Sequence, residues 1–344
     1  MGRKIVGVLL ILLLSVAIPT VAAHSPTFEE GGGELGNATT IENPTKSWVI
    51  YTHLHEEGEV QYYRMEMSEG ERIYVMLSVP KPEGDRGFTP SMALMGPGID
   101  GNATLPPLVE RPADVGVEVE EGRVPDELTY EPFSPSVFYE VSNFSVEAPQ
   151  DGTYYLAVYS QEGSGNYALA VGQRESFTLV EWLLIPINLI RVYEWEGQEW
   201  WLIAVPGILS FVAGAIVMTV ASRRRLHRPD RLWLLATVAG LLMLASGATL
   251  LFQMMLSLYL LGELAVGAVV TLIFSILPLA LGVAALRVAH RERGLYGVGW
   301  KQKGGLIAIG LLGLAFWAGW VVGPALAIAT GLVPRNWLNR TLRK

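Results

Sequence analysis

Hydrophobic and polar residues follow two different periods along this chain, and the change falls near residue 176. Before it, hydrophobic residues alternate with polar ones over short runs; residues 72–79, for example, send Ile73, Val75 and Leu77 to one face. A period of two is typical of half-buried strands, and many short strands with Gly-rich turns are typical of a β-sandwich. After it, the chain contains apolar runs with the length of membrane-crossing helices, about 20 residues. The sequence therefore predicts an α+β multidomain protein, in which an exported all-β sandwich of jelly-roll-like form precedes an α-helical membrane bundle of about four transmembrane helices.

Six segments follow from these patterns. They are a signal peptide (1–23), a flexible N-terminal arm (24–47), an extracytoplasmic β-sandwich (48–175), an interfacial amphipathic segment (176–199), a four-helix transmembrane bundle (200–331) and a basic C-terminal tail (332–344). The first is assigned because Arg3 and Lys4 precede an apolar stretch that ends in small residues, with cleavage expected after Ala23. An uncleaved anchor is the alternative, and either reading places the sandwich outside the cell.

Four apolar runs are long enough to span a membrane, at residues 200–221, 232–254, 264–286 and 305–327. The loops after the first and third runs are rich in Arg and Lys, which resist translocation and mark the cytoplasmic side. The protein is therefore expected in the plasma membrane as a multi-pass protein, with its N-terminal domain extracytoplasmic. Four crossings would leave the C-terminal tail outside the cell, although its basic residues favour the cytoplasmic side. A re-entrant last segment is the alternative.

Residues 179–190 are apolar but too short to cross a membrane, and Pro186 interrupts them. With Trp182 and Arg191 beside them, they are interpreted as a helix lying in the membrane interface. A helix packed beneath the sandwich as part of its core is the alternative.

Charge is divided unequally between the two parts. Between residues 24 and 199, 30 acidic and 9 basic residues give a net charge of −21, whereas 14 basic and 3 acidic residues give residues 200–344 a net charge of +11. Nucleic acid is therefore not an expected partner, because its phosphates would be repelled by the acidic part. The chain has no cysteine, which excludes disulfides, zinc–thiolate sites and a cysteine nucleophile.

Three stretches carry a resemblance to a known family. The order YYRMEMSEGERIYVMLSV, PSMALMGPG and DGTYYLAVYSQEGSGNYALAVG, within residues 59–172, resembles the pre-peptidase C-terminal (PPC) type of β-sandwich. The resemblance implies a β-sandwich fold and a binding or structural role, without catalysis. The full layout also resembles archaeal multi-pass membrane proteins without an assigned activity.

One long insertion departs from the compact PPC pattern. Residues 99–136 are rich in proline and acidic residues, which interrupt regular structure. They are interpreted as a surface excursion. Because long loops often carry binding function, this insertion is also the expected contact surface for a partner or ligand.

No spacing of acidic residues, nucleophiles or bases singles out a catalytic constellation, so no catalytic residue is assigned and no enzyme is expected. We expect the surface-exposed sandwich to act as a non-enzymatic binding or scaffold module for an extracellular ligand or protein. The four apolar runs contain no ionisable residue, which disfavours a proton or ion path. An accessory subunit of a membrane transport complex is a further alternative.

Histidines suggest another alternative, an extracytoplasmic copper-binding protein. His53 and His55 alternate in a predicted strand and would face the same side. Cleavage after Ala23 would give His24 a free amine. An N-terminal His with a strand-borne H-x-H resembles the copper site in the soluble part of particulate methane and ammonia monooxygenase subunits, and nitrogen ligands suit Cu(II). The candidate ligands are His24, His53 and His55. A surface histidine pair without metal is the simpler interpretation.

Two further patterns concern modification and assembly. Asn37, Asn102 and Asn143 begin N-x-S/T triplets and are candidate glycosylation sites. Small residues recur every fourth position in the last apolar run, at Ala315, Gly319, Gly323, Ala327 and Gly331. Such a stripe lets helix backbones approach closely, either within the same bundle or against another subunit in a homo- or hetero-oligomer.

Overall fold

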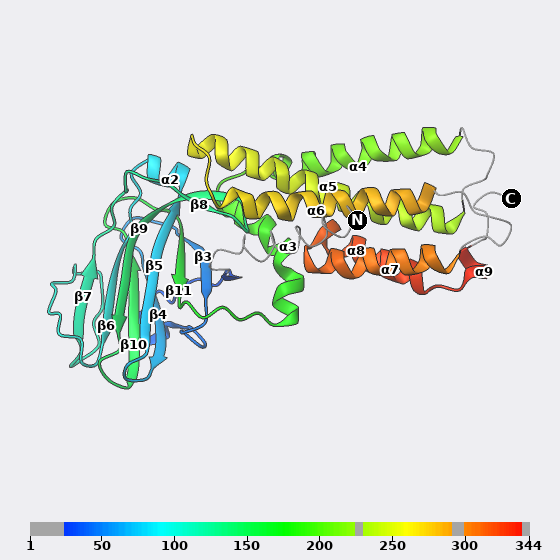
Figure 1. Ribbon diagram of the computed structural model, residues 1–344. Coiled ribbons are helices and arrows are strands. Elements are labelled where there is room, and N and C mark those ends of the chain that lie inside the picture. Colours follow the sequence, from blue (N-terminus) through cyan, green and yellow to red (C-terminus); the bar gives the residue numbers. More distant parts are fainter. Residues whose placement is uncertain (1–23, 224–229, 291–298, 339–344) are drawn as a thin grey trace.

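The computed structural model describes residues 24–223, 230–290 and 299–338. A β-rich part occupies one end and a group of helices the other (Figure 1). The expected division into a β-sandwich followed by an α-helical bundle is therefore confirmed. The predicted signal peptide, residues 1–23, lies outside the described residues.

Two sheets form the sandwich. Their strands are β1 (Ser25–Thr27), β2 (Thr39–Thr40), β3 (Trp48–Leu54), β4 (Val60–Met67), β5 (Arg72–Pro80), β6 (Ser91–Gly96), β7 (Gly116–Glu120), β8 (Thr129–Glu131), β9 (Ser136–Glu147), β10 (Gly152–Tyr159) and β11 (Gly165–Val171). The first sheet has the order β1-β3-β11-β5-β9-β8 and the second the order β2-β4-β10-β6-β7. A short helix, α2 (Lys81–Asp85), and a 3-10 turn, η1 (Leu35–Asn37), complete this part.

The core lies between the two sheets and follows the alternation seen in the sequence. Tyr63, Leu77, Leu94 and Leu156 all have no solvent exposure and belong to one apolar cluster. Removing this apolar surface from water is the main favourable term for folding. A sandwich with this core does not need the disulfides that the sequence lacks.

The N-terminal arm, predicted to be flexible, is an ordered part of both sheets. Its β1 pairs in parallel with β3, and its β2 pairs in parallel with β4. Each therefore covers a sheet edge whose backbone N–H and C=O groups would otherwise stay unpaired. The expectation of flexibility was wrong because these pairings join residues distant in sequence.

The insertion at residues 99–136 is not a free surface excursion. Its first half packs Val109 onto the outer face of the second sheet, against Tyr62, Ala157 and Val117. Its second half forms β8 and continues into contacts with the helices. Most of the insertion is exposed or half-buried, so it lies at the surface as interpreted, but packed rather than free. The segment covers the outer face of the second sheet and connects the sandwich to the helices. Prolines interrupt its apolar residues, so the sequence shows no regular hydrophobic pattern there.

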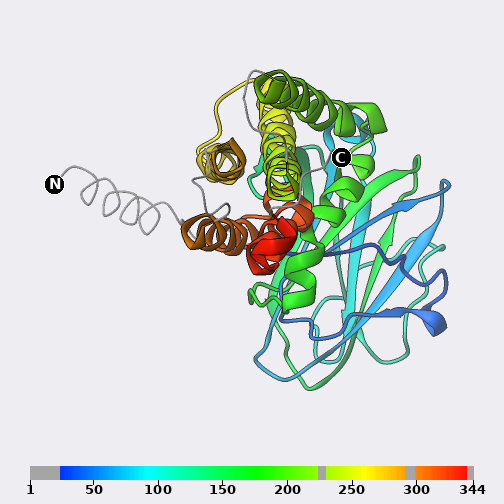
Figure 2. The ribbon, with the colours of Figure 1, turned by 90° about the vertical axis from the view of Figure 1, so that its right-hand side faces the viewer.

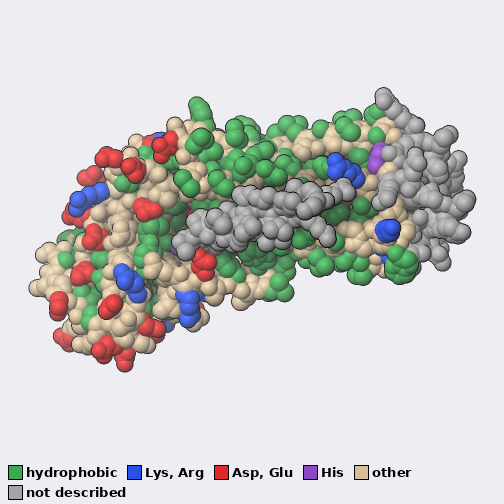
Figure 3. Space-filling model, in the orientation of Figure 1, with side chains coloured by type: hydrophobic (Ala, Val, Ile, Leu, Met, Phe, Trp, Pro, Cys, Tyr) green, Lys and Arg blue, Asp and Glu red, His purple; other side chains and the backbone are tan. Residues whose placement is uncertain are grey.

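Among the described residues, three helices are long and apolar enough to cross a membrane, and they coincide with the first three predicted apolar runs. The helices after the sandwich are α3 (Leu179–Trp195), α4 (Trp200–Arg223), α5 (Arg231–Leu261), α6 (Ala268–His290), α7 (Trp300–Ala315), η2 (Ala318–Val321), α8 (Val322–Leu332) and α9 (Arg335–Leu338). Side-chain capping by Asp230 begins α5, and Gly262 ends it in the left-handed conformation that suits glycine. Apolar side chains cover the helices, and acidic ones gather on the sandwich (Figure 3).

The fourth apolar run is two short antiparallel helices, not one continuous span. Trp317, Gly319 and Trp320 have positive φ, and this break reverses the chain between α7 and α8. Gly310 of α7 then lies against Ile328, and Gly331 of α8 lies against the backbone of Lys303. An antiparallel pair is the chain path that the re-entrant alternative predicted. Length and hydropathy alone cannot distinguish one crossing from a hairpin.

The hairpin returns the chain to the helix end that carries the basic side chains. There, the guanidinium of Arg231 lies 4.2 Å from the ring centroid of Trp337 in α9, and Lys303 Nζ donates to the carbonyl of Val333 at 2.8 Å. The start of the C-terminal tail therefore lies beside the beginnings of α5 and α7, far from the sandwich (Figure 1). Four crossings would have placed the basic tail on the same side as the sandwich. With a hairpin in place of the fourth crossing, the tail starts at the opposite end of the helices.

Four of the five small residues of the stripe are buried within the chain, and Ala315 is exposed. A Cβ atom at Gly319 or Gly323 would meet Met243 of α5, and Ala327 has no exposure. This is the first of the two interpretations offered for the stripe. The small residues let the backbones of neighbouring helices in the same bundle approach closely.

Candidate functional site

Helix α3 lies between the sandwich and the helices, as Figures 1 and 2 both show. It begins with a capping box, in which Thr178 accepts from the N–H of Glu181 and the Glu181 side chain accepts from the N–H of Thr178. Such reciprocal bonds satisfy N–H groups that a helix start leaves free. The sequence allowed either an interfacial helix or a helix packed beneath the sandwich. One face of α3 covers the sandwich, and another exposes Leu179, Val180 and Ile187.

The last turn of α3 is fixed to the first sheet by Trp195. Its ring packs in a buried cluster with Val49, Ala168 and Ala170 on the outer face of that sheet. Its indole Nε1 donates to the carbonyls of Thr52 and Tyr167, at 3.2 and 3.0 Å. At the other end of the helix, Lys46 and Glu181 form an ion pair at 2.6 Å. The helix is thus tied to the sandwich at both of its ends.

A chain of polar side chains, here called the polar junction, joins the sandwich to α5. Gln253 of α5 is fully buried and exchanges two hydrogen bonds with Gln198, at 3.0 and 2.9 Å. Gln198 also donates to Glu196, whose other oxygen accepts from the N–H of Val137 in β9. Burial raises the pKa of Glu196 to about 8. The sequence search for ionisable residues inside the spans passed over Gln253, because an amide carries no charge.

Two more hydroxyl groups connect the helices to the insertion. Ser257 of α5 donates to the carbonyl of Pro135 at 2.9 Å, and Thr271 of α6 donates to that of Pro132 at 2.5 Å. The rings of Phe133 and Phe274 meet edge to face, with centroids 5.7 Å apart. The end of the insertion, at residues 132–135, therefore contacts the chain's own helices.

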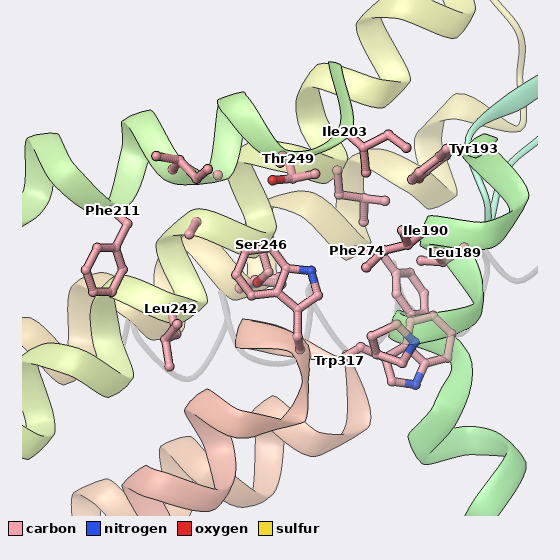
Figure 4. Close-up of a pocket in the computed structure, with 18 of the residues that line it drawn as sticks. Leu189, Ile190, Tyr193, Ile203, Phe211, Leu242, Ser246, Thr249, Phe274 and Trp317 are labelled. Carbon is pink, nitrogen blue, oxygen red and sulfur yellow. The ribbon is translucent and has the colours of Figure 1, made fainter. Parts of the chain in front are cut away.

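An apolar cavity of about 580 Å³ lies where α3, α4, α5, α6 and η2 meet; it is called the helix chamber below. Figure 4 shows it extending from Phe211 and Leu242 toward Leu189 and Ile190 of α3. Aromatic rings form much of its wall: Trp200, Phe211, Phe274, Phe316, Trp317 and Trp320.

The walls of the helix chamber offer few polar groups. Ser246 is already engaged, since it donates to the carbonyl of Met243 and accepts from the N–H of Gly319. Ile208 and Val212 of α4 line the chamber and are about half exposed on the outside of the bundle. The chamber is therefore continuous with the apolar exterior of the helices.

A second cavity of about 330 Å³, the sheet chamber, lies between α3 and the outer face of the first sheet. Leu189 and Trp317 line both chambers. The sheet chamber contains an acid, Glu131, which accepts from the N–H of Phe133 at 3.0 Å. Burial raises the pKa of Glu131 to about 7, although its side chain keeps some solvent contact at the cavity.

The structure brings two of the three predicted histidine ligands together. The rings of His53 and His55 lie 3.9 Å apart, and the third neighbour is Glu30, whose Oε1 lies 3.5 Å from His55 Nε2. His24 lies elsewhere, because the adjacent Ser25 pairs with Trp48 at the opposite end of β3. Its Nδ1 is 2.5 Å from Ser47 Oγ, and burial lowers its pKa.

Sequence reasoning missed Glu30. It belongs to the N-terminal arm, and nothing in its local spacing relates it to β3. The arm is brought there by the pairing of Gly32 with Tyr62. The three candidate sequon residues, Asn37, Asn102 and Asn143, are all exposed, as glycosylation would require.

Comparisons with known proteins add little. No protein-family model matches the chain, and no curated protein matches it. Among solved structures, it is similar to the pre-peptidase C-terminal domain of a collagenase from Bacillus anthracis, at 16% identity and a TM-score of 0.22, over 38% of this chain and 90% of that domain. The hit is to the family that the sequence resembles, but a match of this quality carries no argument about function. The β-sandwich of this chain is established by its own sheets.

Proposed function

We propose that this chain is a multi-pass plasma-membrane protein that holds an acidic β-sandwich outside the cell as a non-enzymatic binding module. We further propose that its helix chamber binds the hydrocarbon chain of a membrane amphiphile. The observation that carries the proposal is the apolar cavity of about 580 Å³ at the level where helices and sandwich meet. The sandwich would recognise an extracellular ligand or protein partner.

Membrane placement is supported by α4, α5 and α6, which are long and apolar enough to span a bilayer. Basic side chains near the helix end away from the sandwich support a cytoplasmic location for that end. They include Arg223, Arg231, Arg287, Lys301 and Lys303. The sandwich would then lie on the outer side.

A hydrocarbon chain suits the helix chamber for three reasons. The walls are mostly apolar, so a hydrocarbon chain can fill the chamber without burying any polar atom of its own. The volume falls in the range of ligand pockets, roughly 300–1,000 Å³. The opening past Ile208 and Val212 faces the surface that lipid would surround, so a chain could enter sideways from the bilayer.

Orientation is tested with single cysteines, since the chain has none of its own. Leu332→Cys, at the exposed end of α8, is expected to resist a membrane-impermeant maleimide added to intact cells and to react after permeabilisation. Glu120→Cys, exposed on β7, is expected to react in intact cells. Labelling of both from outside would contradict a re-entrant hairpin, and labelling of Leu332→Cys alone would reverse the orientation.

Chamber binding is tested by photolabelling in nanodiscs that contain a phospholipid with a diazirine on its acyl chain. In the native chain, label is expected on chamber residues such as Phe211 and Trp317. Ile208→Trp fills the chamber from an exposed wall position and is expected to reduce that label several-fold. Val217→Trp is the control, because Val217 is also exposed on α4 but does not line the chamber. Equal labelling in both variants would overturn the proposal.

A further inference from the structure

We infer that Glu30, His53 and His55 form a surface site for a divalent transition-metal cation of the Zn²⁺ or Cu²⁺ type. The inference goes beyond the proposed function and does not depend on the helix chamber. It rests on three side chains from two segments whose ligand atoms all lie within 4.8 Å of one another.

The ligand atoms are close to a coordinating arrangement. Zinc ligands lie about 2.0–2.2 Å from the ion, so neighbouring ligand atoms around one ion are roughly 3–4 Å apart. Glu30 Oε1 and His55 Nε2 are 3.5 Å apart, within that range. The rings of His53 and His55 lie 3.9 Å apart at an interplanar angle of 62°, so small side-chain rotations can direct both nitrogens at one point.

One buried side chain fixes the backbone on both sides of the site. Gln61, only 2% exposed, donates to the carbonyl of His53 at 2.8 Å and accepts from the N–H of Gly31, next to Glu30, at 3.2 Å. The N–H of His55 donates to Glu59 at 2.5 Å. The backbone beside each ligand is therefore held before any ion binds, which reduces the entropy lost on binding.

The surroundings favour a cation. Residues 24–199 carry a net charge of −21, so the field over this part of the chain attracts positive ions. Two neutral imidazoles and one carboxylate are ligands that Zn²⁺ and Cu²⁺ accept. The His55 and Glu30 side chains are 53% and 54% exposed, which leaves room for water to complete the coordination.

The site differs from the predicted copper site in one testable respect. His24 is absent from it, so metal binding requires neither a free N-terminal amine nor cleavage after Ala23. His24→Gln is therefore a matched control for His53→Gln and His55→Gln.

The test uses the full chain in detergent, stripped with a chelator and titrated with Zn²⁺ in a calorimeter near pH 7.5. One Zn²⁺ per chain is expected. His53→Gln and His55→Gln should each weaken binding at least about tenfold, since loss of even an outer-shell partner typically does so. Glu30→Gln should weaken it as well, and His24→Gln should bind like the native chain. Thermal unfolding without metal checks that each variant is folded.

A second measurement is independent of the variants. Cu²⁺ bound to the native chain at one equivalent should show hyperfine coupling to imidazole nitrogens in its electron paramagnetic resonance spectrum. Absence of a saturable one-to-one site, a Cu²⁺ spectrum without nitrogen coupling, or a loss in His24→Gln equal to that in His53→Gln would each overturn the inference.

Discussion

Replacing Trp195 by alanine is expected to lower the free energy of unfolding by about 3–5 kcal/mol, the range for Trp→Ala in a packed core. Trp195 is 8% exposed and packs on the first sheet against Val49 and Ala170. The change removes that apolar contact and both hydrogen bonds of the indole N–H. Because α3 also lines both chambers, its release should loosen the connection between the sandwich and the helices.

The measurement is thermal unfolding in detergent, followed by circular dichroism, together with limited proteolysis between β11 and α3. Trp195→Ala should unfold at lower temperature and be cleaved faster in residues 172–178. Trp195→Phe keeps an aromatic ring but loses the N–H donor. Its unfolding temperature should lie between those of the native chain and Trp195→Ala. Trp300→Ala, at a tryptophan that is 75% exposed and contacts Lys303, is the control and should cost much less than Trp195→Ala. Equal stability of the Trp195 and Trp300 variants would show that α3 is not held as described.

A leucine at Gly310 is expected to separate α7 from α8. A Cβ there would lie 2.5 Å from Ile328 Cγ1 and 2.7 Å from the carbonyl oxygen of Pro324, closer than real Cβ contacts allow. Overpacking of this kind typically costs about 1–3 kcal/mol, and the larger side chain adds to it where the facing atom is backbone. The hairpin should therefore open or fail to form.

The same helix provides a matched control. Gly305 is also in α7, and a Cβ there meets nothing within 4 Å. Gly305→Leu makes the identical chemical change and gains the same helix propensity, so it should be neutral or slightly stabilising. The readout is the yield of monodisperse protein and its unfolding temperature. Similar behaviour of the two variants would argue against the antiparallel packing of α7 and α8.

Local pattern was enough to predict the main elements. The alternation in β5 and the apolar runs of α4, α5 and α6 depend only on the spacing of hydrophobic residues, which reports burial directly. The pairing of His53 and His55 also followed from a period of two. These are statements about one segment at a time.

The missed features all depend on contacts between distant segments. Glu30 reaches the histidines through the pairing of Gly32 with Tyr62, and Gln253 is paired by Gln198, 55 positions away. The hairpin turns at Trp317, whose positive φ no propensity scale would favour. Hydropathy gave the length of that apolar run, but it could not show that the chain reverses within it.

The short connections and the polar junction together determine how the sandwich can move. Only residues 172–178 separate β11 from α3, and only 196–199 separate α3 from α4, while Gln253, Ser257 and Thr271 hold the other side. A domain on a loose tether can reorient without disturbing its anchor. The sandwich lacks such freedom, so we expect a force on it to reach α4 through α3, and α5 and α6 through the polar junction.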